Sequence, residues 1–194
     1  GLNASLPATC FPTAASVANS WDEILGEEIG TALAEEAVTM DVNVILGPGL
    51  NIKRSPLCGR NFEYFSEDPF LTGTIAAAEL KGLHSSGVTG TIKHFCGNNQ
   101  ETGRHVIDSV ISERALREIY LKGFEIAVKE GNADSIMTTY GAVNGIWTAG
   151  SYDLNTVILR NEWGFDGFVM TDWWADINAV SYTHLRAHET LMNL

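Results

Sequence analysis

Residues 88–95 read Val-Thr-Gly-Thr-Ile-Lys-His-Phe, an apolar and β-branched run that leads into two polar side chains. This composition and length predict a buried strand with Lys93 and His94 at its carboxyl end. Similar runs stand at 42–46, 135–139 and 168–171. Helical patterns separate these runs, and strands that alternate with helices are typical of a parallel sheet with helical crossovers. The sequence therefore predicts an α/β fold.

Four segments between the runs have the sequence signals of helices. The first helix is expected to end near Met40, after a capping box of Ser20 and Glu23. The second has Asp68 as N-cap and Pro69 in its first turn, and extends to about Ser85. The third and fourth are expected from Ser112 to Gly131 and from Leu154 to Gly164.

The segment from Asn51 to Asp68 is too long for a simple connection and does not have the composition of a linker. Its charged side chains, which include Arg60 and Glu63, would usually indicate a solvated surface. Here they alternate with aromatic residues, namely Phe62, Tyr64 and Phe65. The alternation favours a folded, buried loop.

Composition excludes several classes of protein. The chain has 194 residues and a net charge of −12, and no run of Lys or Arg that could follow a phosphate backbone, which argues against nucleic-acid binding. No apolar stretch approaches the roughly 18 to 20 residues that span a bilayer. The glycine clusters do not form a phosphate loop. Cys10, Cys58 and Cys96 fit neither a disulfide framework nor a zinc site, which favours a reducing, cytoplasmic setting. No metal or organic cofactor is expected.

Four candidate functional residues fall at or just beyond predicted strand ends. In parallel α/β folds the loops at the carboxyl ends of the strands converge on one rim, where the chemistry gathers. This rim would hold Lys93, His94, Tyr140 and Asp172. Asp172 precedes Trp173, and a carboxylate beside an aromatic face suits attack on a sugar ring. A lone Asp at a strand-to-helix junction is about as often a helix cap, so position alone does not decide.

The other rim residues have equally plausible structural roles. Lys93 and His94 could donate hydrogen bonds to sugar hydroxyls, or could be a paired lysine and a satisfied buried histidine. Tyr140 and Met137 lie around one strand end, where the Tyr hydroxyl could bond the nucleophile or simply pack in the core.

Six motifs, taken in order, resemble the first domain of family 3 glycoside hydrolases, in particular the bacterial β-glucosidase branch. The resemblance covers about residues 1–180. The motifs are Pro7-Ala8-Thr9-Cys10-Phe11-Pro12, Leu46-Gly47-Pro48-Gly49 with Asn51-Ile52, Gly59 through Pro69, Lys93-His94-Phe95, Met137 through Gly145, and Gly167 through Trp173.

The resemblance implies a partial (β/α)8 barrel, truncated at both ends, because a complete barrel takes about 250 residues. It implies hydrolysis of terminal, non-reducing β-glycosyl residues with retained configuration, and Asp172 as the nucleophile. The substrates would be small β-glucosides or oligosaccharides. The expected sugar subsite consists of Arg60, Lys93, His94, Met137, Tyr140 and Trp173. The resemblance gives no oligomeric state and no sugar or linkage preference.

Two departures from the family pattern matter. The family's upstream Asp-Gly-Pro anchor precedes this chain, and the acid/base glutamate of the glucosidase branch lies in a second domain beyond it. A retaining mechanism needs two carboxyl groups, so the isolated chain is expected to be inactive. Residues 181–194 resemble translated adapter sequence and are predicted to be a non-native tail, which removes His184 and His188 from the candidate site.

Three alternatives stay open. A non-catalytic carbohydrate-binding remnant would hold a sugar through Arg60, Lys93, His94 and Trp173 without turnover. A β-N-acetylhexosaminidase of the same family would use a histidine soon after Lys-His-Phe. The loop at 96–101 has the glucosidase pattern, but His105 lies nearby. A structural or interaction module would bind no sugar.

Overall fold

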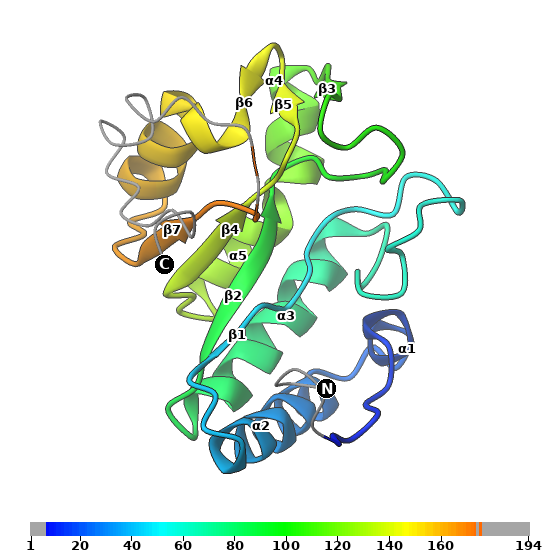
Figure 1. The fold of residues 1–194 in the computed structure, drawn as a ribbon, viewed down its shortest axis with the longest axis vertical. Helices are drawn as coiled ribbons and strands as arrows, with labels where there is room; N and C mark the ends of the chain where they lie inside the picture. Colours follow the sequence, from blue (N-terminus) through cyan, green and yellow to red (C-terminus); the bar gives the residue numbers. More distant parts are fainter. Residues whose placement is uncertain (1–6, 174, 176–194) are drawn as a thin grey trace.

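A computed structural model of the chain describes residues 7–173 and 175. Its main sheet contains β1 (Val44–Ile45), β2 (Thr89–Phe95), β4 (Ser135–Thr138) and β7 (Phe168–Met170), hydrogen-bonded in that order. All neighbouring pairs are parallel, as Figure 1 shows. The four predicted strands and their parallel arrangement are confirmed.

The first strand is shorter than the predicted run at 42–46, because the chain leaves regular pairing at Leu46. It nevertheless stays beside β2. The Lys93 amide donates to the Pro48 carbonyl at 3.1 Å, and the Leu50 amide donates to the Lys93 carbonyl. The segment after β1 is therefore fixed against the carboxyl end of β2.

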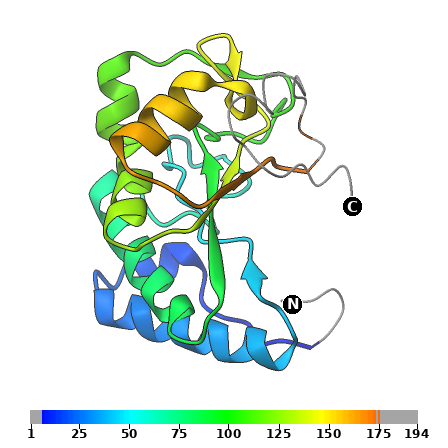
Figure 2. The same cartoon turned by 90° about the vertical axis from the view of Figure 1, so that its left-hand side faces the viewer.

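The helices α3 (Pro69–His84) and α5 (Lys122–Lys129) lie on one side of the sheet, on the left in Figure 2, and α2 (Glu23–Thr39) packs against α3 and runs along the bottom of that view. The third predicted helix is divided. It begins as α4 (Glu113–Ala115), passes through the π-helical η1 (Leu116–Tyr120) and continues as α5. The fourth, η3 (Asp153–Glu162), is also π-helical. A short helix, α1 (Ala14–Ala18), precedes α2 and was not predicted.

Side-chain caps fix where the helices begin. The Asp68 carboxylate accepts from the Leu71 amide at 2.8 Å and the Ser112 side chain caps α4, both as predicted. The capping box of Ser20 and Glu23 is wrong. Asp22 caps α2 by accepting from the Ile24 amide at 2.9 Å, whereas the Ser20 hydroxyl donates back to the Val17 carbonyl. The reason is position, because only Asp22 directly precedes the first helical residue.

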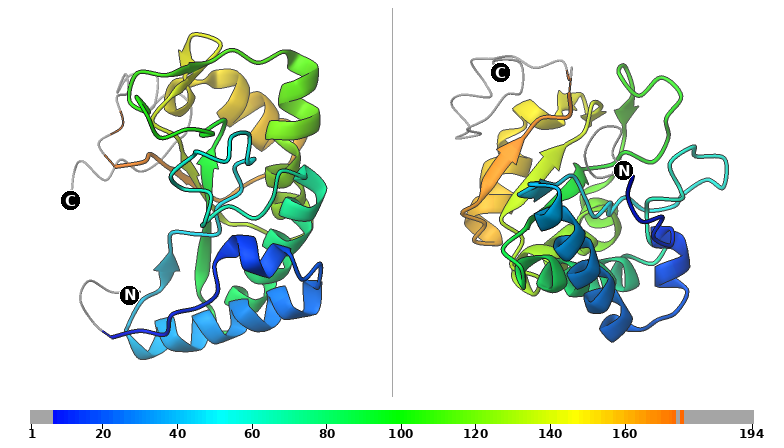
Figure 3. Two further views of the ribbon diagram at one scale, coloured as in Figure 1. Left: turned by 90° about the vertical axis from the view of Figure 1, so that its right-hand side faces the viewer. Right: turned by 60° about the horizontal axis from the view of Figure 1, so that its bottom comes forward.

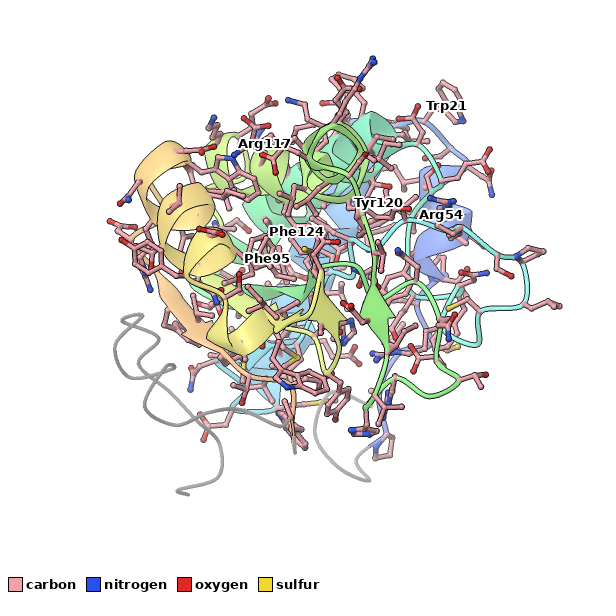
Figure 4. The ribbon with its side chains drawn as sticks, turned by 90° about the horizontal axis from the view of Figure 1, so that it is seen from above. Trp21, Arg54, Phe95, Arg117, Tyr120 and Phe124 are labelled. Atoms are coloured by element: carbon pink, nitrogen blue, oxygen red, sulfur yellow. The ribbon has the colours of Figure 1, made fainter. Side chains whose placement is uncertain are left out.

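The buried core lies between the sheet and these helices. The Phe95 ring is fully buried and meets the Phe124 ring of α5 edge-on, with centroids 5.3 Å apart. Figure 4 shows the two rings side by side inside the molecule. The Trp163 ring also meets the Phe95 ring edge-on, with centroids 6.0 Å apart. Phe95 thus anchors the end of β2 that carries Lys93 and His94.

A small second sheet covers the carboxyl end of β4. It contains β3 (Asp108–Ser109), β5 (Ala142–Val143) and β6 (Ile146–Trp147), followed by the 3-10 turn η2 (Thr148–Gly150). Asn144 and Gly145 connect β5 to β6 with positive φ angles of 52° and 83°. An Asn-Gly pair with these angles is a favoured two-residue hairpin turn. This sheet was not predicted.

Within the described residues the main sheet is open, with β1 and β7 as its edges. Figure 3 shows the four strands as one twisted layer with the helices outside it. Four parallel strands with helical crossovers correspond to part of a (β/α)8 barrel. No helix of this part of the chain has the length and apolar character that a bilayer crossing needs. The predicted tail at 181–194 lies outside the described residues.

Candidate active site

Asp172 and His94 come together at the carboxyl rim of the sheet. Asp172 follows β7, and His94 is the second-last residue of β2. The Asp172 Oδ2 and His94 Nε2 atoms are 3.7 Å apart. Asp172 is 9% exposed and His94 is 2% exposed, so both polar groups face a largely dehydrated space.

A β-bulge turns the end of β2. Lys93 pairs with Met137, but Phe95 pairs with Thr138, so His94 is an extra residue on this strand. In a regular strand Lys93 and His94 would point to opposite faces. Here the two side chains contact neighbouring residues of one loop, because Lys93 pairs with Glu63 and His94 contacts Tyr64. Bulges commonly re-aim side chains beside active sites, and this one accounts for a consecutive Lys-His pair on the rim.

Arg60 and Lys93 share the carboxylate of Glu63. The Arg60 Nε atom bonds one carboxylate oxygen, and Lys93 Nζ lies 3.2 Å from the other. Burial alone would raise the pKa of Glu63, but the two cations outweigh burial and lower it. Burial alone would lower the pKa of Arg60, but the bond to Glu63 and the nearby negative charges outweigh burial and raise it. This network keeps two cations and an ionised Glu63 in place beside Asp172.

Tyr140 lies on the Asp172 side of the rim. The Arg104 guanidinium lies 4.6 Å from its ring centroid, and the His105 ring centroid is 4.2 Å from it. Burial raises the pKa of Tyr140, and the negative charge of Asp172 raises it further. Tyr140 therefore carries its proton and can donate a hydrogen bond to the Asp172 carboxylate.

Opposing effects act on Asp172 itself. Burial raises the pKa of its carboxyl group, while the positive charge of Arg60 and the hydrogen bond from Tyr140 lower it. The net shift is upward, so burial wins. A partly desolvated carboxylate with few tight partners is a suitable nucleophile.

His94 is neutral in this environment. Burial holds its pKa well below the usual value, and the nearby positive charges, first Arg60, act in the same direction. The contact with Asp172 is therefore not an ion pair. Asn51 holds the His94 backbone at both ends, since its amide donates to the His94 carbonyl and its oxygen accepts from the His94 amide, both at 2.9 Å.

The remaining predicted subsite residues lie at the same edge. Met137 is buried on β4, in register with Lys93 on one side and Met170 on the other. Trp173 follows Asp172 and is half exposed, at 49%. Because Trp174 and 176–180 lie outside the described residues, a capping role of Asp172 is not tested.

The structure resolves the alternatives for the loop at 51–68 only in part. Tyr64 and Phe65 are buried as predicted, but Phe62 is 59% exposed, so the aromatic alternation does not bury every ring. Gly49 explains the fit of Tyr64, because a Cβ atom at Gly49 would lie 2.8 Å from the Tyr64 ring. Lys93 has the structural role considered above, since it is paired with the carboxylate of Glu63.

Sequence reasoning missed several members of the network, namely Asn51, Tyr64, Asn98, Glu101 and Arg104. Arg104 pairs with Glu101 at 3.0 Å, and Asn98 donates to both Tyr64 and Glu101. The loop at 97–107 supplies three of these residues, and Figure 1 shows it in green beside the cyan loop that carries Arg60. The sequence signal was weak because the contacts join distant parts of the chain: Asn51 and Tyr64 precede His94 by 43 and 30 residues.

Two cavities flank the network. One of about 390 Å³ lies between the loops at 54–59 and 97–109 and includes Glu101. The other, of about 350 Å³, includes Glu63, Lys93 and the segment Gly47–Gly49. Among the residues that the structure describes, no group of three or more His, Cys, Asp or Glu side chains could hold a metal ion.

Comparison with known proteins places this geometry in a family. The family model described as "Glycosyl hydrolase family 3 N terminal domain" matches residues 1–193. A β-glucosidase of Ruminococcus albus is 66% identical over 91% of this chain, and thermostable β-glucosidase B of Acetivibrio thermocellus is 52% identical over 93%. The chain spans only 19% and 24% of these two relatives.

Solved structures agree with this result. β-Glucosidase 3B of Thermotoga neapolitana, in complex with α-D-glucose, superimposes with a TM-score of 0.92 at 49% identity. The match covers 94% of this chain and 26% of that protein. The predicted barrel-type α/β fold is thereby confirmed. The chain belongs to glycosyl hydrolase family 3, to whose N-terminal domain it corresponds.

Proposed function

We propose that this chain forms the nucleophile-bearing part of a retaining β-glucosidase, with Asp172 as the nucleophile. The observation that carries the proposal is the buried Asp172 carboxylate 3.7 Å from a neutral His94, at the rim of a family 3 domain. In the first step the Asp172 oxygen attacks the anomeric carbon and the leaving oxygen departs with a proton from an acid. In the second step water displaces Asp172, so the configuration is retained.

The other rim residues would bind the sugar rather than react. Arg60 and Lys93 carry donors beside Asp172 and keep part of their donor capacity free after pairing with Glu63. Neutral His94 can donate one hydrogen bond, and the exposed Trp173 ring offers an apolar face for the sugar ring. Several fixed donors around one carboxylate suit a polyhydroxylated substrate.

The acid is not evident among the described residues. Glu63 lies at the same rim, but its pKa is lowered by Arg60 and Lys93, so it is held ionised and cannot donate a proton near neutral pH. Glu101 is paired with Arg104. We infer that the acid/base comes from sequence that the longer relatives contain, and that the chain alone is inactive toward ordinary glucosides, whose leaving oxygen needs a proton.

Two observations favour related substrates as second candidates. An exo-α-(1→6)-L-arabinopyranosidase of Bifidobacterium longum is 53% identical over 90% of this chain. An α-L-arabinopyranosyl unit resembles a β-D-galactosyl unit without its exocyclic carbon, so one ring site could accept related sugars. The His105 ring lies against Tyr140, which is a hydrogen-bond partner of Asp172. His105 is therefore the candidate for a histidine acid/base, and an N-acetylhexosaminide is the substrate that this alternative predicts.

The test uses a chain completed with the missing sequence of the Ruminococcus albus relative. A 2-fluoro-glucoside with a good leaving group should trap the glycosyl-enzyme, and peptide mass mapping should find the label on Asp172. Asp172→Asn should give no label. An active enzyme that is labelled elsewhere, or never labelled, would disprove the proposed nucleophile.

A panel of aryl glycosides tests the substrate. We expect the β-glucoside to be the best substrate, ahead of the β-xyloside, the α-L-arabinopyranoside and the N-acetyl-β-glucosaminide. A preference for the N-acetyl sugar that His105→Ala abolishes would favour the hexosaminidase alternative. Sugar binding without any turnover would favour the carbohydrate-binding alternative.

A further inference from the structure

Both ring nitrogens of His94 face a specific partner. Nδ1 lies 3.0 Å from the Tyr64 hydroxyl oxygen, and Nε2 lies 3.7 Å from Asp172 Oδ2. A neutral imidazole carries only one proton, so one of these nitrogens donates and the other accepts. Whether His94 presents a donor or an acceptor toward Asp172 therefore depends on which nitrogen carries the proton.

The environment of Tyr64 decides this question. The Asn98 side-chain nitrogen lies 3.1 Å from Glu101 Oε1, which accepts only, so the amide orientation of Asn98 is fixed. The same nitrogen donates to the Tyr64 oxygen at 2.9 Å. Tyr64 thus already accepts one bond and has one proton to donate. Among its contacts in the described part of the chain, His94 Nδ1 is the available acceptor.

The opposite arrangement is unfavourable at both ends. If Nδ1 carried the proton, the Tyr64 oxygen would accept from both Asn98 and His94. The buried Tyr64 proton would then have no acceptor among these two contacts. Nε2 would then direct a lone pair at the Asp172 carboxylate. Tyr64 is 1% exposed, so water is poorly placed to relieve either problem.

We propose that Asn98 and Tyr64 form a buried hydrogen-bond chain that fixes His94 as the Nε2–H tautomer, with its N–H directed toward Asp172 and the sugar site. Tyr64 is then a positioning residue, since it acts on the site only through His94. The assignment of the tautomer stands on geometry alone, whereas its effect on turnover rests on the proposed function.

The hydrogen-bond chain of Asn98 and Tyr64 also helps to hold His94 in place. Asn51 fixes the His94 backbone from one side, and Tyr64 fixes the ring from the other. Gly49 allows the Tyr64 ring to approach, since a side chain there would displace it. One donor of defined direction therefore sits beside the Asp172 carboxylate before any substrate arrives, which is the condition for preorganised binding.

Long-range ¹H–¹⁵N NMR of the histidine-labelled chain tests the tautomer directly, with His94→Gln identifying the signal. We expect a neutral His94 with its proton on Nε2. In Tyr64→Phe the Nδ1 resonance should move toward that of an unbonded nitrogen. Tyr120→Phe is the matched control: the Tyr120 hydroxyl is bonded to Arg54, which Figure 4 shows beside it, whereas the His94 ring is bonded to Tyr64, so the His94 signals should not change.

A proton on Nδ1 in the unchanged protein would overturn the proposal, as would an Nδ1 resonance that Tyr64→Phe leaves in place. If Tyr64→Phe does not fold, Asn98→Ala takes its place, and an unchanged Nδ1 resonance again overturns the role of the chain. In the completed enzyme, Tyr64→Phe should lower kcat/KM roughly five- to tenfold, the value of one hydrogen bond, and Tyr120→Phe should not. Failure to label Asp172 while the tautomer is as expected would reject the proposed function alone.

Discussion

Asp172 destabilises the folded protein at the pH where the proposed reaction needs it charged. Its folded pKa is raised above the ordinary value, mainly by burial. Above that folded pKa, the carboxyl group is ionised in both states and ionisation is easier in the unfolded chain. This contribution to stability is therefore present below the ordinary pKa and lost as pH rises through the raised one.

Asp172→Asn should consequently raise the melting temperature at neutral pH, where each kcal/mol corresponds to roughly 2–4 °C in a chain of this size. The gain should shrink as the pH falls through the raised pKa and vanish below the ordinary carboxyl pKa, where Asp172 is protonated in both states. Thermal unfolding followed by circular dichroism between acidic and neutral pH measures this. Asp166→Asn, an exposed carboxylate near the same strand, is the control. A constant difference at all pH values would contradict the assignment to Asp172 ionisation.

At this scale the sequence predicts the residues that follow strands but not their partners. Lys93, His94 and Asp172 could be placed on one rim because parallel strands end together. Tyr64 and Asn98 could not, because their contacts with the His94 ring depend on the folding of two long loops. The bulge at His94 was equally hidden, since nothing in a Lys-His-Phe run distinguishes a bulged residue from a regular one.

At the scale of elements, the contact between α2 and α3 depends on backbones that touch. A Cβ atom at Gly30 would lie 2.1 Å from the Glu79 carbonyl oxygen, and one at Gly82 would lie 2.2 Å from the Glu27 carbonyl oxygen. Both obstacles are backbone atoms, so neither can move without separating the helices. The two glycines are thus required by packing and not by conformation.

Gly30→Ala should destabilise the protein by about 1–3 kcal/mol, the usual cost of overpacking, in spite of the better helix propensity of alanine. Gly26→Ala is the matched control on the same helix, since the nearest atom to its Cβ would be the Ala78 Cβ, at 3.3 Å, and the Ile75 carbonyl oxygen would lie at an ordinary 3.5 Å. It should be close to neutral. Urea unfolding of both variants measures the difference, and an equal effect of the two substitutions would show that the close approach at Gly30 does not matter.

Element prediction succeeded where a local signal agreed with the packing. Asp68 and Ser112 cap the helices expected of them, and the four apolar runs form the four parallel strands. The hairpin at 142–147 was missed although Asn144-Gly145 is a strong turn signal, because its strands are only two residues each. The π-helical segments have no sequence signal of their own, since they arise from how a helix fits its neighbours.

At the scale of the whole molecule, the described residues include the nucleophile and the sugar subsite that we propose, but no evident acid. Asp172 lies near the positively charged side chains of Arg60 and Lys93, and the same two side chains keep Glu63 ionised. The length of the family 3 relatives, of which this chain spans about a fifth to a quarter, offers room for the missing group. The barrel fold could be predicted from motifs and strand order, but the division of catalytic groups followed only from the resemblance.

Dependence on the leaving group separates a missing acid from a damaged site. General acid catalysis contributes about 10²- to 10⁴-fold, and it matters most when the leaving oxygen is basic. Compared with the completed enzyme, the 194-residue chain should lose at least that much with an alkyl β-glucoside and far less with a dinitrophenyl β-glucoside. Azide, which needs no base to attack the glycosyl-enzyme, should accelerate the chain alone and give the β-glucosyl azide. Equal losses with both glucosides would indicate a distorted subsite instead, and an α-glucosyl azide would exclude the covalent intermediate on Asp172.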